Sequence, residues 1–447
     1  MKRVISFFAI DKSIALNLFG RGWQSIAGLI TLWAIGHYLT VIEQGFYFTF
    51  LSVLGLQVFF ELGLGYVILQ FASHEVAHLT WNKAGLLEGD LLVKNRLSAF
   101  FRYSLTWGLV VAILILAIIF PVGHYFFSKQ PITNSGYILW QAPWFLICLF
   151  SSLVALVNII FCYLEGCGFV KEIAGVRVIQ NVLASIAMWG LLKFDGHLYS
   201  ASLMLAVSAV VGIFYLIFCK KQFILDIFRT KKFGGLRLDC SKELWPMQWR
   251  IALSWISGYI VYQLASPIVF AYQGPKAAGQ IGMSMAIGLA LMSFSMAWIS
   301  TKSNKFGMLV AKRNFKELNK VFYISARASS SLVFVMALMA SGINYFLHIN
   351  GSNYADRLLA PTAFFVLMLS SVATFLTYAL ALYMRAHKKE PLAFNSLLGA
   401  VASISFLFIF AKYYSLNAVV LGYFIVSVMI LGLTVKKFIE KKKEWQE

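Results

Sequence analysis

Residues 44–71 read QGFYFTFLSVLGLQVFFELGLGYVILQF, an apolar run interrupted by a single charged residue, Glu61. A membrane-spanning helix needs about 20 mainly apolar residues at a rise of about 1.5 Å per residue. The segment therefore predicts a transmembrane helix that is long enough to tilt. A charge near the bilayer centre costs about 2.5 to 3.5 kcal/mol on insertion scales, so such a residue usually faces a cavity or a partner. The same stretch thus indicates the fold class and a candidate functional residue.

The composition of the whole chain agrees with this segment. Of the 447 residues, 60% are apolar, 16% are aromatic and only 13% are charged. Soluble domains carry about 25% charged residues, so this composition excludes a soluble enzyme. The five Cys residues have spacings that match neither a zinc site nor a disulfide framework. The basic N-terminus lacks a signal-peptide cleavage pattern, which predicts an uncleaved first span that begins in the cytoplasm.

The apolar pattern predicts an all-α polytopic membrane protein with about twelve transmembrane helices. The predicted spans are 14–36, 44–71, 100–121, 138–163, 173–192, 199–219, 248–271, 279–300, 327–347, 360–384, 392–411 and 417–435. No gap between neighbouring spans is long enough to hold a separate soluble domain.

The distribution of basic residues supports this topology. If the N-terminus lies inside, the cytoplasmic stretches hold 32 of the 38 Lys and Arg residues. Five of the outer loops hold one each, namely Lys129, Lys193, Lys276, Arg357 and Lys412, and Arg21 lies inside the first span. Because Lys and Arg favour cytoplasmic loops, both termini are expected in the cytoplasm. The net charge of +20 is therefore mainly orientation charge, and no nucleic-acid partner is expected.

The two halves of the chain share one plan, which is typical of transporters built from repeats. Each half begins with two spans joined by a short outer loop, followed by a basic cytoplasmic stretch and four further spans. Tyr38 precedes Gly45 by seven residues in the first half, as Tyr272 precedes Gly279 in the second. The expected parts are an N-terminal six-helix lobe (1–219), a basic cytoplasmic connector (220–247), a C-terminal six-helix lobe (248–435) and a basic cytoplasmic tail (436–447).

The connector mixes basic and apolar residues around Gly-Gly and Trp-Pro breaks. This pattern predicts an amphipathic segment along the inner leaflet, with anionic membrane lipids as partners.

Two charges are expected deep within spans, Arg21 in the first and Glu61 in the second. Arg21 offers a permanently charged guanidinium that suits an anionic head group. Glu61 is a candidate for coupling transport to a proton or a cation. An alternative is an ion pair between Arg21 and Glu61 that only holds two helices together, and both interpretations stay open.

Further polar side chains lie near Arg21 and Glu61 and in the seventh span. Gln24 and Gln57 each lie one helical turn from one of the charges, on the same helix face. The seventh span offers Arg250 at its inner end and Gln263 deeper. The candidate substrate-binding residues are therefore Arg21, Gln24, Gln57, Gln263 and Arg250, with Glu61 as the candidate for ion coupling.

One enzyme motif occurs in the chain. His74, Glu75 and His78 spell H-E-x-x-H, which binds zinc when both imidazoles lie on one face of a helix. The motif falls at the inner end of a predicted span and has no clear third ligand, so interfacial surface residues are the preferred interpretation. No metal site, catalytic residue or cofactor is expected, and the absence of a P-loop argues against direct use of ATP.

Short motifs then point to a family. Glu61, Leu62, Gly63 and Leu64 match an acidic-Leu-Gly-Leu run in the second span, and Gly274, Pro275 and Gly279 match a Gly-Pro turn followed by Gly. With twelve spans in two halves, the chain resembles the multidrug/oligosaccharidyl-lipid/polysaccharide (MOP) exporter superfamily. Within this superfamily it is similar to the polysaccharide transporters, and among these to the O-antigen flippases.

The resemblance implies a MATE-like fold of two six-helix pseudo-repeat lobes in the bacterial cytoplasmic (inner) membrane. It implies transport of an undecaprenyl-pyrophosphate-linked oligosaccharide, an O-antigen or other surface polysaccharide repeat unit, from the inner to the outer leaflet. Alternating access coupled to H⁺ or Na⁺ is the implied mechanism, and a polysaccharide polymerase is an implied partner. Arg21 would then bind the pyrophosphate.

Two other functions fit the sequence less well. A cation-coupled multidrug exporter would be favoured by a second mid-membrane acid in the later half, which the sequence does not offer. A membrane polysaccharide polymerase or ligase would display a large external loop with Arg or His, whereas the longest outer loop, 122–137, holds only Lys129 and His124 as ionisable residues. A transporter rather than an enzyme is therefore expected.

Overall fold

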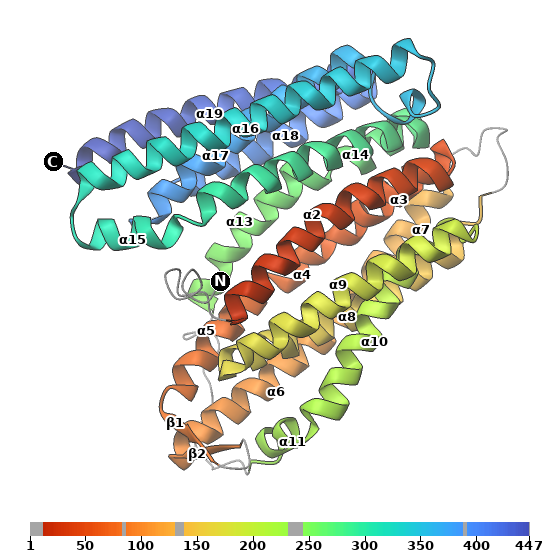
Figure 1. Ribbon diagram of the computed structural model, residues 1–447. Coiled ribbons are helices and arrows are strands. Elements are labelled where there is room, and N and C mark those ends of the chain that lie inside the picture. Colours follow the sequence, from red (N-terminus) through yellow and green to blue (C-terminus); the bar gives the residue numbers. More distant parts are fainter. Residues whose placement is uncertain (1–11, 83–85, 130–137, 231–244, 388–390, 447) are drawn as a thin grey trace, which may run out of the picture. The chain divides into compact units, whose positions relative to one another are not determined.

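The computed structural model describes residues 12–82, 86–129, 138–230, 245–387 and 391–446, and these form a helical protein (Figure 1). The first half comprises α2 (Lys12–Tyr38), α3 (Val41–Leu54), the 3₁₀ turn η1 (Gly55–Gln57), α4 (Val58–Glu61), α5 (Leu64–Val76), α6 (Leu91–Leu114), the π-helix η2 (Ile115–Ile119), α7 (Phe120–Ser128), α8 (Gln141–Leu164), the π-helix η3 (Glu165–Phe169), α9 (Val170–Lys193), α10 (Tyr199–Cys219) and α11 (Lys221–Arg229). The second half comprises α13 (Trp245–Gln263), α14 (Ala265–Ser300), α15 (Ser303–Ala311), α16 (Phe315–Ile349), the 3₁₀ turn η4 (Ala355–Arg357), α17 (Pro361–Arg385), α18 (Ala393–Tyr413) and α19 (Leu416–Gln446).

The predicted all-α membrane fold is confirmed. Nine helices in the described ranges are long and apolar enough to cross a membrane. Two of these, Gln141–Lys193 and Trp255–Ser300, each contain two of the predicted spans. The first predicted span corresponds to α2, which is helical although it is not among the nine. Each of the twelve predicted spans therefore falls on helix.

One short element departs from the all-helical expectation. β1 (Leu79–Trp81) and β2 (Leu87–Gly89) form an antiparallel hairpin that pairs Thr80 with Glu88. Leu79 and Leu87 are buried while their neighbours are exposed. The hairpin therefore closes one end of the hydrophobic core of its unit.

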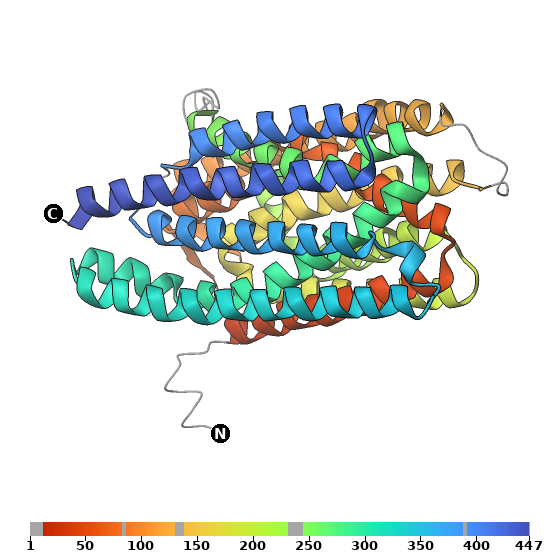
Figure 2. The same ribbon diagram turned by 90° about the horizontal axis from the view of Figure 1, so that it is seen from above.

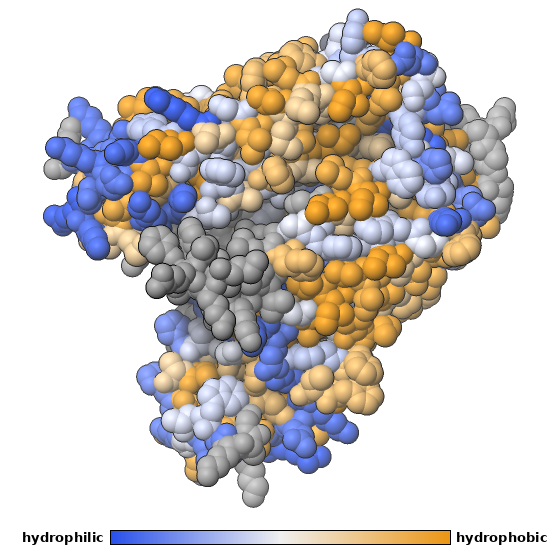
Figure 3. All heavy atoms as spheres, viewed as in Figure 1, coloured by the Kyte–Doolittle hydropathy of each residue, from blue (hydrophilic) through white to orange (hydrophobic). Residues whose placement is uncertain are grey.

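Apolar side chains cover the outside of the long helices, as lipid contact requires. Only 17% of the most apolar window of α16 and 22% of that of α10 is buried within the protein. Phe334, Leu338, Met339 and Ile343 are among the exposed side chains of α16. Figure 3 shows apolar residues along the middle of the helices of the second unit and hydrophilic residues near their ends. An exposed apolar surface of this extent marks contact with a membrane or a partner.

The chain divides into two compact units. The first contains residues 1–27 and 54–255, and the second contains residues 28–53 and 256–447. The chain passes from one unit to the other within α2, at the end of α3 and within α13. Gly28, Gly55 and Gly258 lie within three residues of these crossings. Glycine lowers helix stability by about 1 kcal/mol relative to alanine, so the chain is locally weak where it changes units.

The first unit packs α5, α6, α8, α10 and α11 around one apolar core. The short helix α11 is amphipathic, and its Phe223 and Ile227 are buried in that core. On its polar side, Asp226 pairs with Lys94 at 2.9 Å, and Arg102 donates hydrogen bonds to backbone carbonyls at the end of the helix. The start of the predicted connector is therefore docked on this unit, while residues 231–244 lie outside the described residues.

The second unit is a bundle in which α16, α17, α18 and α19 run alongside one another (Figures 1 and 2). Phe322 and Phe438 pack with Tyr383 at one end of the bundle. The Tyr383 hydroxyl donates to Asn319 Oδ1 at 2.8 Å and accepts from Gln446 Nε2 at 2.6 Å. This small network joins the last turn of α19 to α16 and α17.

Two backbones come into contact where α3 crosses α14 in the second unit. A Cβ atom on Gly45 would lie 2.0 Å from the carbonyl oxygen of Pro275, and one on Gly279 would lie 3.0 Å from the nitrogen of Gly45. Gln44 is fully buried and donates hydrogen bonds to the carbonyls of Gly279 at 2.9 Å and Arg357 at 3.0 Å. The two glycines at equivalent places in the sequence halves therefore meet each other.

Candidate functional site

The helix that carries Glu61 is broken at that residue. α3 continues through η1 into the short α4, which ends at Glu61, and α5 begins at Leu64. Between them Leu62 (φ 49°) and Gly63 (φ 68°) adopt the left-handed conformation. For a residue with a Cβ, this conformation costs about 1 to 2 kcal/mol. Such strain is concentrated at functional sites, and interrupted helices form the binding sites of many transporters.

The break places the Glu61 carboxylate at the C-terminus of α4, partly buried in the first unit. A Cβ on Gly65 would lie 3.1 Å from Cys162 Sγ, so α5 packs tightly on α8 immediately after the break. The chain that follows Glu61 is thereby held against α8, three residues before a charged pair begins at Glu165.

The charged pair consists of Arg177 on α9 and Glu165 in η3. Arg177 Nη2 lies 3.4 Å from Glu165 Oε2, and Nη1 lies 3.3 Å from Asn158 Oδ1. The guanidinium also lies over the ring of Phe161, 5.6 Å from its centroid. Gly168, with φ of 100°, interrupts the helix between Glu165 and Arg177, and the contact with Asn158 shows that α9 folds back along α8.

One face of α8 carries the polar residues of this cluster. Ser151, Asn158 and Cys162 are separated by seven and four residues, and Glu165 follows three residues later, so all four lie on one side. Ser151 Oγ donates to Gln57 Oε1 at 3.0 Å. The predicted site residue Gln57 therefore faces this stripe.

The geometry leaves Arg177 able to accept a different anion. Its two polar contacts, at 3.3 and 3.4 Å, are longer than the usual 2.9 to 3.0 Å of an N–H···O hydrogen bond. Its side chain is 37% exposed, while that of Glu165 is 17% exposed. Charge-assisted contacts to phosphate are about 2.7 to 2.9 Å and often bidentate. An incoming phosphate could thus form shorter contacts with Arg177 than Glu165 does.

The other predicted site residues lie on two helices, α2 and α13. Arg21 and Arg250 fall on α2 and α13, and their side chains lie outside the described residues. Gln24 is exposed on α2 in the first unit. Gln263 is exposed at the end of α13 in the second unit, where its Oε1 accepts a long hydrogen bond of 3.5 Å from Ser52. Gln57 and Glu61 lie four residues apart on the interrupted helix, and Gln57 contacts Ser151 of α8.

The H-E-x-x-H residues are arranged differently from a zinc site. α5 ends at Val76, so the helix stops between His74 and His78. Glu75 pairs with Arg96 at 3.1 Å, and both histidines are exposed. Within the described residues, no group of three or more His, Cys, Asp or Glu side chains is placed to hold a metal ion.

Sequence reasoning missed the Arg177 cluster. The predicted topology assigns Arg177 to a cytoplasmic stretch, but it lies two turns into the apolar helix α9. Two signals were available: Arg177 falls inside the predicted span 173–192, and Glu165 adjoins the glycines 166 and 168. What the sequence could not supply is the fold-back of α9 that brings Arg177 beside Asn158.

Comparisons with known proteins find similarity in structure only. No family model matches the chain, and no curated protein sequence matches it. An inward-facing multidrug resistance MATE family transporter of the MOP superfamily superposes with a TM-score of 0.63 at 15% identity, over 94% of this chain and 99% of that one.

Two further structures are similar over nearly all of both chains. A MATE transporter in complex with the compound MaL6 gives a TM-score of 0.60 at 15% identity, covering 99% of each chain. A MOP superfamily transporter from Pyrococcus furiosus, described as having a binding pocket of reverse polarity, gives 0.54 at 13% identity over 99% of this chain and 98% of that one. The chain therefore has the fold of the MATE transporters of the MOP superfamily.

Proposed function

We propose that this protein is a membrane transporter that moves a lipid-linked oligosaccharide, an undecaprenyl-pyrophosphate-linked repeat unit of a surface polysaccharide, from the inner to the outer leaflet. The observation that carries the proposal is the cluster of Arg177, Glu165 and Asn158, in the unit that also contains the membrane helix broken after Glu61. The MATE-like fold supports a transporter, and the motif Glu61–Leu64 supports the polysaccharide branch.

The cluster suits a pyrophosphate head group. Arg177 carries a permanent positive charge with five N–H donors in a fixed plane, which matches phosphate oxygens. In the absence of substrate, Glu165 and Asn158 satisfy part of this donor set through long contacts. A pyrophosphate would take the place of Glu165, and Arg21 on α2 remains a second candidate for the same anion. The positive charge of Arg177 is balanced by Glu165 when the site is empty and by pyrophosphate when the site is filled. This balance lowers the free-energy cost of holding Arg177 in the protein without substrate.

Glu61 is the proposed coupling residue. It is a partly buried acid at the break of a membrane helix, where it can take up H⁺ or a cation. Binding of pyrophosphate adds negative charge to the same unit, which makes uptake of H⁺ or Na⁺ by Glu61 more favourable. This sequence of events links substrate binding to ion binding within one unit.

The chain connectivity supports alternating access. Three helix segments join the two units, and each has a glycine close to the crossing. The proposed location is the bacterial inner membrane with both termini in the cytoplasm, as the basic loops predict. A polysaccharide polymerase remains the proposed partner for the product, and anionic lipids the partner of the connector.

A transport assay with matched variants tests the proposal. Proteoliposomes that contain a labelled undecaprenyl-pyrophosphate oligosaccharide would report its appearance in the outer leaflet. Arg177→Gln is expected to abolish this movement, and Lys193→Gln, which removes a cation at the other end of the same helix, is expected to leave it intact. Equal rates for both variants would contradict the role of Arg177, and no movement with the unaltered protein would contradict the function.

A cation-coupled multidrug exporter is the second candidate. The specific observation in its favour is a membrane acid, Glu61, in a fold shared with multidrug resistance MATE transporters. The two functions differ in the expected response to Arg177→Gln. A drug exporter for cationic compounds would keep or gain activity when a positive charge is removed beside its acids, whereas a lipid-pyrophosphate transporter would lose it.

A further inference from the structure

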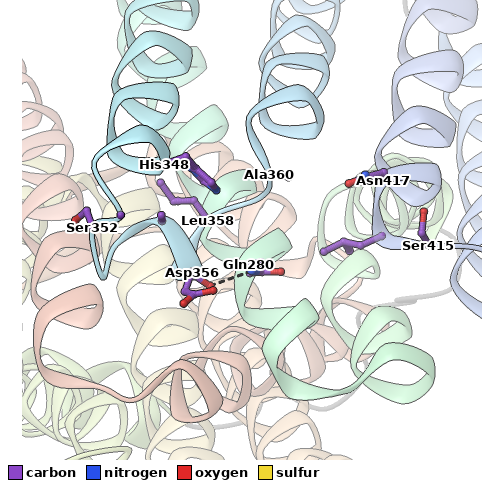
Figure 4. Close-up of a pocket in the computed structure, with 11 residues that line it drawn as sticks. Gln280, His348, Ser352, Asp356, Leu358, Ala360, Ser415 and Asn417 are labelled. Carbon is purple, nitrogen blue, oxygen red and sulfur yellow. Dashed lines mark hydrogen bonds between the residues drawn. The ribbon is translucent and has the colours of Figure 1, made fainter.

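A polar cavity lies at one end of the second unit, away from the residues discussed so far. It has a volume of about 450 Å³, within the roughly 300 to 1,000 Å³ that small-molecule sites occupy. Its walls come from α14, the end of α16, the segment around η4 and the start of α19. Figure 4 shows Gln280, His348 and Asn417 reaching toward this space from three different helices.

The polar groups of the cavity are held so that both donors and acceptors remain available. His348 Nδ1 lies 2.9 Å from the carbonyl oxygen of Asn344, so it donates there and the neutral ring keeps Nε2 as an acceptor. Gln280 Nε2 donates to the carbonyl of Asp356 at 2.9 Å, which leaves Gln280 Oε1 as an acceptor. The Asn417 amide makes no side-chain hydrogen bond to another described residue and offers both kinds of group.

The charge of the cavity decides which class of ligand it fits. Among the described residues that line it, Asp356 alone carries a charge at neutral pH. Its carboxylate pairs with Lys276 at 3.0 Å at the edge of the site. A phosphate would meet a carboxylate and no lining cation, and a divalent metal would find a single carboxylate ligand where several oxygens are needed. Both anions and metal ions are therefore disfavoured.

Neutral, hydroxyl-rich molecules match this lining. Each sugar hydroxyl both donates and accepts a hydrogen bond, as do the amide and hydroxyl groups of Asn417, Gln280 and Ser415 taken together. Leu358, Leu416 and Ala360 add apolar wall surface that can pack on the C–H groups of a sugar ring.

We propose that this cavity is a carbohydrate-binding site that holds one or two sugar residues of the transported oligosaccharide. The proposal rests on the proposed function for the identity of its ligand. It lies at the end of the unit that contains Lys276, Arg357 and Lys412, three of the residues expected outside the membrane, so the site faces the compartment that receives the sugar.

Direct binding to the purified full chain tests the site without requiring transport. Saturation-transfer difference NMR with lactose, N-acetylglucosamine and galactose as probes would detect contact of sugar protons with the protein. Asn417→Leu is expected to weaken the Kd about five- to thirtyfold, the equivalent of one or two net hydrogen bonds. His348→Phe, which keeps the ring shape and removes the nitrogens, is expected to act in the same direction.

Asn353→Leu provides the matched control, because Asn353 is an exposed residue of the connection between α16 and α17 that does not line the cavity. Equal loss in Asn353→Leu and Asn417→Leu would overturn the site, as would displacement of the sugars by inorganic phosphate or Ca²⁺. Movement of the lipid-linked substrate with no binding of any probe sugar would overturn this site and leave the proposed function standing. Sugar binding without movement of the lipid-linked substrate would support the site and contradict the proposed function.

Discussion

The close crossing of α3 and α14 predicts that Gly45→Ala destabilises the protein. The alanine methyl would lie 2.0 Å from the carbonyl oxygen of Pro275, whereas real Cβ contacts are essentially never under 3.0 Å. The two backbones must therefore separate by about 1 Å. Overpacking of this kind costs about 1 to 3 kcal/mol. Because a backbone atom rather than a flexible side chain is in the way, local adjustment cannot remove the clash.

The same separation affects the buried Gln44. Its hydrogen bonds to the carbonyls of Gly279 and Arg357, at 2.9 and 3.0 Å, would lengthen beyond bonding distance, at about 1 kcal/mol each. The higher helix propensity of alanine relative to glycine stabilises the folded state by about 1 kcal/mol. The net loss is therefore about 2 to 4 kcal/mol. At roughly 2 to 4 °C per kcal/mol for a unit of this size, the apparent Tm should fall by about 5 to 15 °C.

Thermal unfolding of the purified protein in detergent, followed by tryptophan fluorescence, measures this change. Gly432→Ala is the matched control, because it places the same methyl on an exposed helix position with nothing within 4 Å. Its Tm should be unchanged or higher, since only the gain in helix propensity remains. Equal melting temperatures for the two variants would refute the reasoning that the crossing is sterically closed.

Three further predictions concern single residues in the two units. Leu62→Gly should raise the free energy of unfolding by about 1 kcal/mol, because glycine adopts the left-handed conformation without a Cβ penalty. An unchanged or lower Tm would argue against strain at the helix break. Tyr383→Phe should lower the free energy of unfolding by about 1 to 3 kcal/mol, because Asn319 and Gln446 lose the hydroxyl that they share. Proteolysis of the C-terminal turn should become faster, and an unchanged rate would contradict the role of this network. Arg177→Lys should retain only part of the transport activity of the unaltered protein, because an ammonium cannot form the bidentate contact; full activity would show that a point charge is sufficient.

Most of the fold could be predicted from the sequence because membrane insertion depends on local composition. A run such as 44–71 has to satisfy its backbone hydrogen bonds within itself in lipid, so length and apolar content suffice to predict a helix. The same reasoning located twelve spans, each of which falls on helix in the structure. The hairpin at Leu79–Gly89 was not predicted, because its pairing depends on two leucines that are buried by other helices.

The candidate site could be predicted only in part. Glu61 and Gln57 stand out because polar residues are rare within an apolar run, and the structure places Gln57 in contact with Ser151 of α8. Arg177 did not stand out, since its distance from Glu165 is set by the break at Gly168 and the fold-back of α9. The left-handed backbone at Leu62 also gave no signal of its own, because leucine is a normal residue of a continuous helix.

By itself, then, the sequence determined that this protein is a bundle of membrane helices and which charge lies in the second helix. Both follow from interactions between each residue and the bilayer, which depend on local sequence alone. Only the tertiary structure decided that Gly45 meets Gly279, that Arg177 joins Glu165 and Asn158, and that His348, Gln280 and Asn417 share one cavity. These contacts join residues from separate helices, and they form only when side-chain packing fixes how those helices cross.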